Sequence, residues 1–205
     1  MDAYSLKKVT TFLEQDHIRK LIEQEDLESV YTKYGYSSCD LTEYLLEVCN
    51  VQPDLYMSYI PSGFLRSSKI INEYNISNSV KRICDEAFYL SSVSNVTIPD
   101  GVEIVGKKAF AICHYLTTVR IPDNVQRIED EAFYDCRWLT EVSIPGSVTH
   151  IGSMAFSRCA MFDATGVTIH FGGTKKQWQS IVKGAFRDTY YVAHCTDGDI
   201  VKRRK

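Results

Sequence analysis

"IPDGVEIVGKKAFAICHYLTTVRIPDNVQRIEDEAFYDCRWLTEVSIPGSVTHIGSMAFSRC", residues 98–159, repeats nearly the same pattern three times. Starting from Ala87 and Phe88, the dipeptide Ala-Phe recurs at steps of 22, 23 and 23 residues, and Ile-Pro recurs at a step of 23. Three cysteines keep the same interval: Cys113, Cys136 and Cys159. Several registers that agree on one period indicate a repeat architecture, so this stretch decides the fold.

Each repeat predicts one short strand followed by a turn. The pattern L-x-x-V-x-I, as in Leu116, Val119 and Ile121, ends in the alternation of a strand with one inward face. Proline follows the well-formed strands, where a strand can end but not continue. We expect the later segment, such as "EDEAFYDC", to form a helical turn with acids near its start and with Ala and Phe inward. Stacked units then bury the apolar face that one unit leaves open.

This pattern closely resembles the BspA-like leucine-rich repeat family, whose units read like "L-x-x-I-x-I-P-x-x-V-x-x-I-G-x-x-A-F-x-x-C". The resemblance covers about residues 70–165; Gly106 and Gly152 keep the glycine of the pattern, whereas Cys84 and Glu129 replace it. It implies an α/β fold, a short right-handed leucine-rich-repeat solenoid with a parallel sheet on its concave side. It also implies a surface for binding and supplies no catalytic residues.

We expect the two ends of the chain to form caps, because the terminal apolar layers of a solenoid must be buried. Near the C-terminus, Val167 and Ile169 continue the sheet, Thr174 and Gln177 fit a helix capping box, and "YYVAHC" predicts a closing strand. Apolar residues at helical spacing predict a small N-terminal bundle. The predicted domains are a helical cap at 1–64, repeats at 65–165, and a strand–helix–strand cap with a basic tail at 166–205.

The composition is that of a globular protein, with 44% hydrophobic residues and a net charge of −3 over 205 residues. Residues 1–64 carry 11 acids and 5 bases, and the rest of the chain carries 15 acids and 18 bases. The chain shows neither an apolar run of about 18 residues nor an apolar secretory segment at its start. We therefore expect a cytoplasmic protein of the producing or infected bacterial cell that is not bound to a membrane.

Sequence motifs of catalysis are absent, since none of the common nucleophile, metalloprotease or phosphate-loop patterns occurs. His194 and Cys195 are neighbours on a predicted strand and should point to opposite faces. The cysteine ladder predicts reduced core thiols, with a zinc site and an inter-repeat disulfide as alternatives. We expect no enzymatic activity, metal, cofactor or small-molecule substrate.

Two surfaces are candidates for binding a protein partner. The first is the outward side of the predicted strands, which is polar and mixed in charge: Asn95, Thr97, Thr118, Arg120, Glu141 and Ser143. The second follows the ladder cysteines, where family units carry small polar residues and this chain carries larger ones, with Arg158 beside them: His114, Tyr115, Arg137, Trp138 and Arg158. Tyr115 and Trp138 are 23 residues apart and should stack. The alternatives are a solvated sheet face and rings that cover a neighbouring loop.

The sequence therefore favours a non-enzymatic protein–protein interaction module, such as a phage or bacterial factor that inhibits a host protein. One alternative is a fragment of a bacterial cell-surface adhesin, which the family resemblance permits. Another is a nucleic-acid-associated or nucleic-acid-mimicking protein that uses the basic tail or the acidic head, although the net charge makes nucleic acid a less favoured partner.

Overall fold

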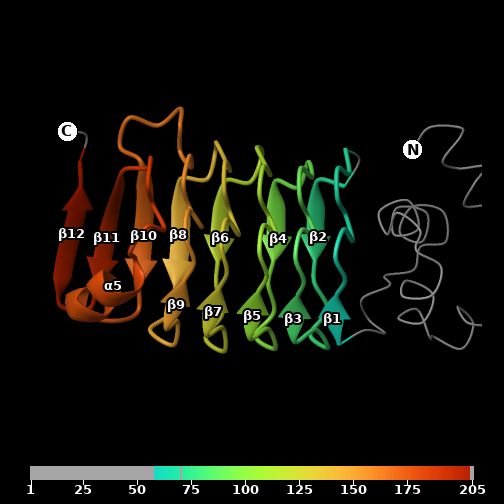
Figure 1. Ribbon diagram of the computed structural model, residues 1–205, viewed down its shortest axis with the longest axis horizontal. Helices are drawn as coiled ribbons and strands as arrows, with labels where there is room; N and C mark the ends of the chain where they lie inside the picture. The colour runs from blue at the N-terminus through green and yellow to red at the C-terminus, as the bar shows by residue number, and fades with distance from the viewer. Residues whose placement is uncertain (1–57, 70, 204–205) are drawn as a thin grey trace, which may run out of the picture.

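The computed structural model describes residues 58–69 and 71–203, which form a solenoid with two rows of short strands (Figure 1). The first row is one parallel sheet: β1 (Tyr59–Ile60), β3 (Arg82–Ile83), β5 (Ile104–Val105), β7 (Arg127–Ile128) and β9 (His150–Ile151). The second row follows the other side of the turns: β2 (Glu73–Asn75), β4 (Asn95–Thr97), β6 (Thr118–Arg120), β8 (Glu141–Ile144), β10 (Val167–Phe171), β11 (Tyr191–Cys195) and β12 (Gly198–Lys202). The predicted leucine-rich-repeat solenoid with a parallel sheet is confirmed.

The second row contains the strands that the V-x-I pattern predicts. Val119 of β6 lies beside Val142 of β8, and Val142 lies beside Ile169 of β10, so equal apolar side chains stack at one level of the sheet. The paired strands of this row run parallel, except that β11 and β12 are antiparallel. The first row was not foreseen, because strands of two residues are too short to show an alternating pattern.

The segment around Ala-Phe forms hydrogen-bonded turns and not the expected helical turn. The residue before each Ala has a positive φ, which a right-handed helix excludes: Glu86, Lys108, Glu131 and Met154. Several backbone hydrogen bonds of this segment run between turns of the solenoid, as from Phe110 N–H to Ala132 O at 2.8 Å, while others close the turn locally. The acids here are not first-turn helix residues either. Asp130 Oδ1 accepts the Ser153 N–H of the next turn at 2.7 Å, so this carboxylate ties two repeats together.

The phenylalanines of the repeats form a continuous column in the core. Phe88, Phe110, Phe133, Phe156 and Phe186 stack nearly parallel, with successive ring centroids 4.8, 5.2, 5.1 and 5.0 Å apart. Each of these rings is buried. The repeat period therefore builds the core directly, because it places one ring above the next.

The C-terminal cap closes this column. Helix α5 (Lys175–Ile181) begins with the predicted capping box of Thr174 and Gln177, and its fully buried Trp178 lies against Phe171 and Phe186. Strand β11 matches the predicted closing strand, whereas β12 was not predicted. Lys202, expected in a basic tail, belongs to β12, and its Nζ donates to the carbonyl oxygens of Phe186 and Arg187.

The predicted N-terminal helical cap lies almost entirely outside the described residues, so it stays a prediction. The first described residues already belong to the stack. Strand β1 pairs with β3, and the fully buried Phe64 meets the ring of Phe88 edge-on, with centroids 6.0 Å apart. Among residues 58–69 and 71–203, no helix has both the length and the apolar character needed to span a bilayer.

Candidate functional site

The first candidate surface, here called the strand face, is the outward side of β4, β6 and β8. The predicted residues of these strands lie on it, five exposed and one half-exposed: Asn95, Thr97, Thr118, Arg120, Glu141 and Ser143. The buried residues between them, such as Val119, hold the strands against the core. The Arg120 guanidinium lies 3.7 Å from the Asp100 carboxylate, and both are well exposed, so this pair adds little stability.

The strand face continues beyond β8 into a line of histidines and carboxylates on β10, β11 and β12. His170 Nε2 lies 3.3 Å from Glu141 Oε1, and the ring of His170 lies 5.6 Å from that of His194 on the next strand. His194 Nδ1 in turn lies 2.9 Å from Asp199 Oδ1. His194 thus meets a carboxylate on the exposed side, whereas its neighbour Cys195 is half-buried.

The second candidate surface is an exposed apolar edge, here called the aromatic ridge: Tyr115, Trp138, Met161 and Phe162. Their exposed fractions are 61%, 51%, 52% and 63%, high for large apolar side chains. Tyr115, Trp138 and Met161 are one repeat apart, so this row can be read from the period.

The expected stack of Tyr115 on Trp138 is not among the ring contacts of the described residues. Trp138 instead meets Phe162 of the following loop, with centroids 5.0 Å apart and planes inclined at 37°. Since Phe162 stays 63% exposed, the contact does not amount to one ring covering another.

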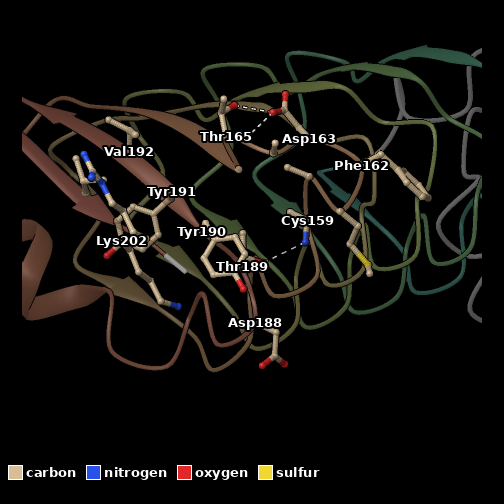
Figure 2. A pocket seen from close by; sticks show the side chains of 16 residues that line it. Cys159, Phe162, Asp163, Thr165, Asp188, Thr189, Tyr190, Tyr191, Val192 and Lys202 are labelled. Carbon is tan, nitrogen blue, oxygen red and sulfur yellow. Dashed lines mark hydrogen bonds between the residues drawn. The ribbon is translucent and has the colours of Figure 1, made fainter. Parts of the chain in front are cut away.

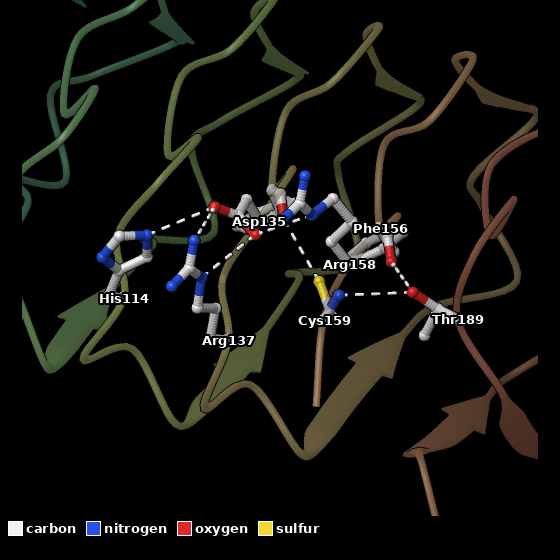
Figure 3. A network of polar contacts seen from close by, with 8 residues as sticks. His114, Asp135, Arg137, Phe156, Arg158, Cys159 and Thr189 are labelled. Carbon is white, nitrogen blue, oxygen red and sulfur yellow. Dashed lines mark hydrogen bonds and ion pairs between the residues drawn. The ribbon is translucent and has the colours of Figure 1, made fainter. Parts of the chain in front are cut away.

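Asp135 holds together three of the predicted binding residues beside the ridge (Figure 3). Its carboxylate is 8% exposed and lies 3.3 Å from His114 Nε2, 3.1 Å from an Arg137 terminal nitrogen and 3.1 Å from Arg158 Nε. The side-chain hydrogen bond with Tyr134, and then the Asp135 carboxylate, raise the pKa of Arg158. The predicted cations are therefore partly engaged within the protein.

Asp135 itself was missed by sequence reasoning. It aligns with Ile112 and Arg158 in neighbouring repeats, and all three have a positive φ. An acid at an irregular turn position carries no sequence signal of burial. Only the neighbouring turns, which bring His114 and Arg158 to it, make it the centre of a charged cluster.

A hollow of about 710 Å³ opens where the aromatic ridge ends (Figure 2). Met161 and Phe162 belong to both the ridge and the hollow. Its walls come from the loop at 159–166, from residues 188–192 and from 201–203. The backbone N–H and the hydroxyl of Thr165 both donate hydrogen bonds to Asp163 Oδ1, so this loop is ordered by its own hydrogen bonds.

Comparison with known protein families decides what this stack of repeats is. A family model described as "BspA type Leucine rich repeat region" matches six copies, over residues 30–163 and 58–193. The chain belongs to the BspA-type leucine-rich repeat family. Leucine-rich repeats of this kind are a general protein-interaction fold, since stacked turns offer an extended rigid surface.

Solved structures of bacterial leucine-rich repeat proteins are similar to this chain. A leucine rich cell surface protein from Faecalibacterium prausnitzii is 27% identical with a TM-score of 0.57, over 61% of this chain and 32% of that protein. A leucine-rich repeat protein from Bacteroides ovatus is 27% identical with a TM-score of 0.43, over 51% of this chain and 28% of that protein. The chain thus spans about a third of the length of each. Comparison with curated proteins finds no match.

The thiols of the BspA-type repeats point into the stack. Sγ of Cys113, Cys136 and Cys159 donates to a phenylalanine carbonyl oxygen of an earlier turn, at 3.0, 3.1 and 3.2 Å. Burial raises the pKa of Cys113 to about 12 and raises that of the other two as well. The five cysteines of the described residues are all free, and those residues contain no group of three or more His, Cys, Asp or Glu placed to hold a metal ion. These thiols act as protonated donors within the core.

Proposed function

We propose that this protein is a non-enzymatic interaction module that binds a protein partner through the aromatic ridge, with the strand face beside it. The exposure of the ridge carries the proposal, because large apolar side chains on a rigid stack are expected to be covered by a partner. Trp and Tyr are among the residues that contribute most at protein interfaces. The backbone that carries the ridge residues is held in place, since buried core residues such as Leu116 and Leu139 directly follow Tyr115 and Trp138 in the chain.

The Asp135 cluster supports the same surface. It holds Arg137 and Arg158 in defined positions next to Trp138, although both guanidinium groups remain more than a third exposed. Side chains that are already ordered lose less conformational entropy on binding, which favours affinity. Two arginines around one carboxylate also leave excess positive charge, which suits an acidic group on the partner.

Replacing Trp138 and Phe162 together by alanine is expected to weaken partner capture by about thirtyfold or more, as for loss of an interface hot spot. Tagged protein incubated with lysate of the producing bacterium, followed by mass spectrometry of the retained proteins, measures this. The matched control replaces Lys176 and Gln179, two exposed residues of α5 outside both candidate surfaces, and should retain partners as the unmodified protein does. If the ridge variant melts at the same temperature as the unmodified protein and recovers the same partners at equal yield, the ridge is not the binding surface.

We further propose that the protein works in the bacterial cytoplasm. The free thiols support this, since cysteines persist reduced mainly in that compartment. The second candidate function is that of a cell-surface adhesin fragment, and the similarity to a leucine rich cell surface protein favours it. Both candidates use the same interaction surface and differ in the compartment where the partner is met.

Thiol labelling in intact cells distinguishes the two compartments. Cys84 and Cys195 are half-buried, and we expect them to react with a membrane-permeant maleimide but not with an impermeant one. Desolvation raises the pKa of both thiols, so labelling should accelerate as the pH rises from 7 to 9. The buried ladder cysteines should stay unlabelled in the folded protein and serve as the internal control. Labelling by the impermeant reagent would instead support the adhesin function.

A further inference from the structure

Strand β12 leaves one edge of the second sheet open. The sheet order ends at β12, which lies at the outer end of the row (Figure 1). Val167 N–H donates to Tyr190 O, so the even-numbered residues of β11 direct their backbone groups toward β10, and the odd-numbered ones toward β12. Ala193 lies opposite Ile200, which places the backbone groups of Gly198, Ile200 and Lys202 against β11. The N–H and C=O groups of Asp199 and Val201 therefore point away from the sheet.

The usual protection of such an edge is missing here. Exposed strand edges are commonly blocked by proline or by a lysine that projects over the edge. The strand, "GDIVK", contains no proline, and its lysine is turned aside because Lys202 Nζ donates to the carbonyl oxygens of Phe186 and Arg187. Val201 is 49% exposed. The edge is thus suited to pairing with another strand.

The charges around Val201 select the partner strand. Asp199 and Arg203 lie two residues before and two residues after Val201, on the same side of the chain. When two copies of β12 pair antiparallel about a two-fold axis at Val201, each Asp199 lies opposite Arg203 of the second copy. The two valines meet at the axis, and the outward backbone groups at 199 and 201 form the ladder. The same strand is therefore its own complement in both charge and shape.

We propose that this edge binds a second copy of the chain, forming a symmetric dimer with one sheet continuous across β12. The pairing is closed, because each copy uses its free edge at this end once. The aromatic ridge is not needed for it, so the dimer does not depend on the function proposed above. His194 stays beside Asp199, with Nδ1 2.9 Å from Asp199 Oδ1.

Charge reversal tests this dimer in the full-length protein. We expect sedimentation equilibrium at low salt to show a concentration-dependent dimer for the unmodified protein. Asp199→Arg and Arg203→Asp should each weaken self-association roughly tenfold or more, since two like-charge pairs replace two opposite-charge pairs. An equimolar mixture of the two variants should associate again, because each chain then offers the charge that the other lacks. Recovery in the mixture also shows that neither variant is misfolded.

Two further variants complete the test. Val201→Pro removes an outward N–H without breaking the β11 pairing, and it should give a monomer that melts like the unmodified protein. Lys176→Asp changes the net charge as much as Arg203→Asp but lies exposed on α5, and it should leave the dimer intact. If the unmodified protein sediments as a monomer at every concentration, the proposal is overturned. The edge would then be exposed to solvent or would pair with a strand of another protein. Dimers that persist in both charge variants overturn it as well.

Discussion

Phe133→Ala is expected to lower the free energy of unfolding by about 3–5 kcal/mol. Phe133 is fully buried at the middle of the ring column, 5.2 Å from Phe110 and 5.1 Å from Phe156. Removing the ring takes away its own apolar burial and also one face of each neighbour's contact. Since every turn packs only on adjacent turns, no distant part of the fold can fill the gap.

Thermal and urea unfolding followed by circular dichroism measure this loss, which should lower the melting temperature by about 10 °C for a chain of this size. Phe133→Leu keeps most of the volume and should cost clearly less. Trp138→Ala removes an aromatic residue of the same repeat that is 51% exposed, and it should change stability by no more than about 0.5 kcal/mol. Equal melting temperatures for Phe133→Ala and Trp138→Ala would contradict the ring column as the source of stability.

Gly152→Ala is the second large effect, with an expected loss of about 3 kcal/mol. A Cβ at this position would collide with the backbone nitrogen of Asp130 and come within 2.6 Å of both Asp130 Oδ1 and the carbonyl carbon of Glu129. These atoms belong to the preceding turn, which Asp130 also holds through the Ser153 N–H. The turn must shift to admit the methyl group, and the shift weakens the hydrogen bonds between the two repeats.

Glu129 provides the matched control, because it occupies the position of Gly152 in the preceding repeat. It already carries a Cβ, and its partners Arg127 and His150 are exposed, so Glu129→Ala should cost less than about 1 kcal/mol. Urea unfolding of the two variants compares them directly. A Gly152→Ala protein as stable as Glu129→Ala would show that the two turns have room that the structure does not indicate.

The glycines of the repeat illustrate what the sequence could predict: it shows their positions but not the physical reason for them. Gly106 and Gly152 stand out as family positions in the sequence, but their reason lies in contacts with the preceding turn: with Cys84 and Asp85 for Gly106, and with Glu129 and Asp130 for Gly152. A sequence shows that a glycine recurs and not which backbone approaches it. The same holds for the helical turn expected around Ala-Phe, because Glu131 has a positive φ and donates its N–H to Ser153 O of the next turn, a contact that the sequence does not show.

Some positions of the candidate binding residues could likewise be predicted from the sequence, whereas others depend on tertiary contacts. The exposed positions of the strand face follow from alternation within one strand, so Thr118 and Arg120 could be placed from the sequence. The pairing of Trp138 with Phe162 depends on the path of the loop after Cys159, and the cluster of His114, Arg137 and Arg158 depends on a buried Asp135. Neither leaves a periodic trace.

From its residues alone, the chain's period of 23 predicts a stack and the inward column of phenylalanines, because both depend on spacing repeated at fixed intervals. The capping box is predicted by the local spacing of Thr174 and Gln177. Tertiary structure decides the remainder: the first row of two-residue strands, the ion pairs around Asp135 and the open edge of β12. The two-residue strands are too short to show an alternating pattern, and the other two features depend on which side chains and backbone groups adjacent turns bring together. A repeat therefore specifies its core by periodicity, while its surface is specified by the residues that break the period.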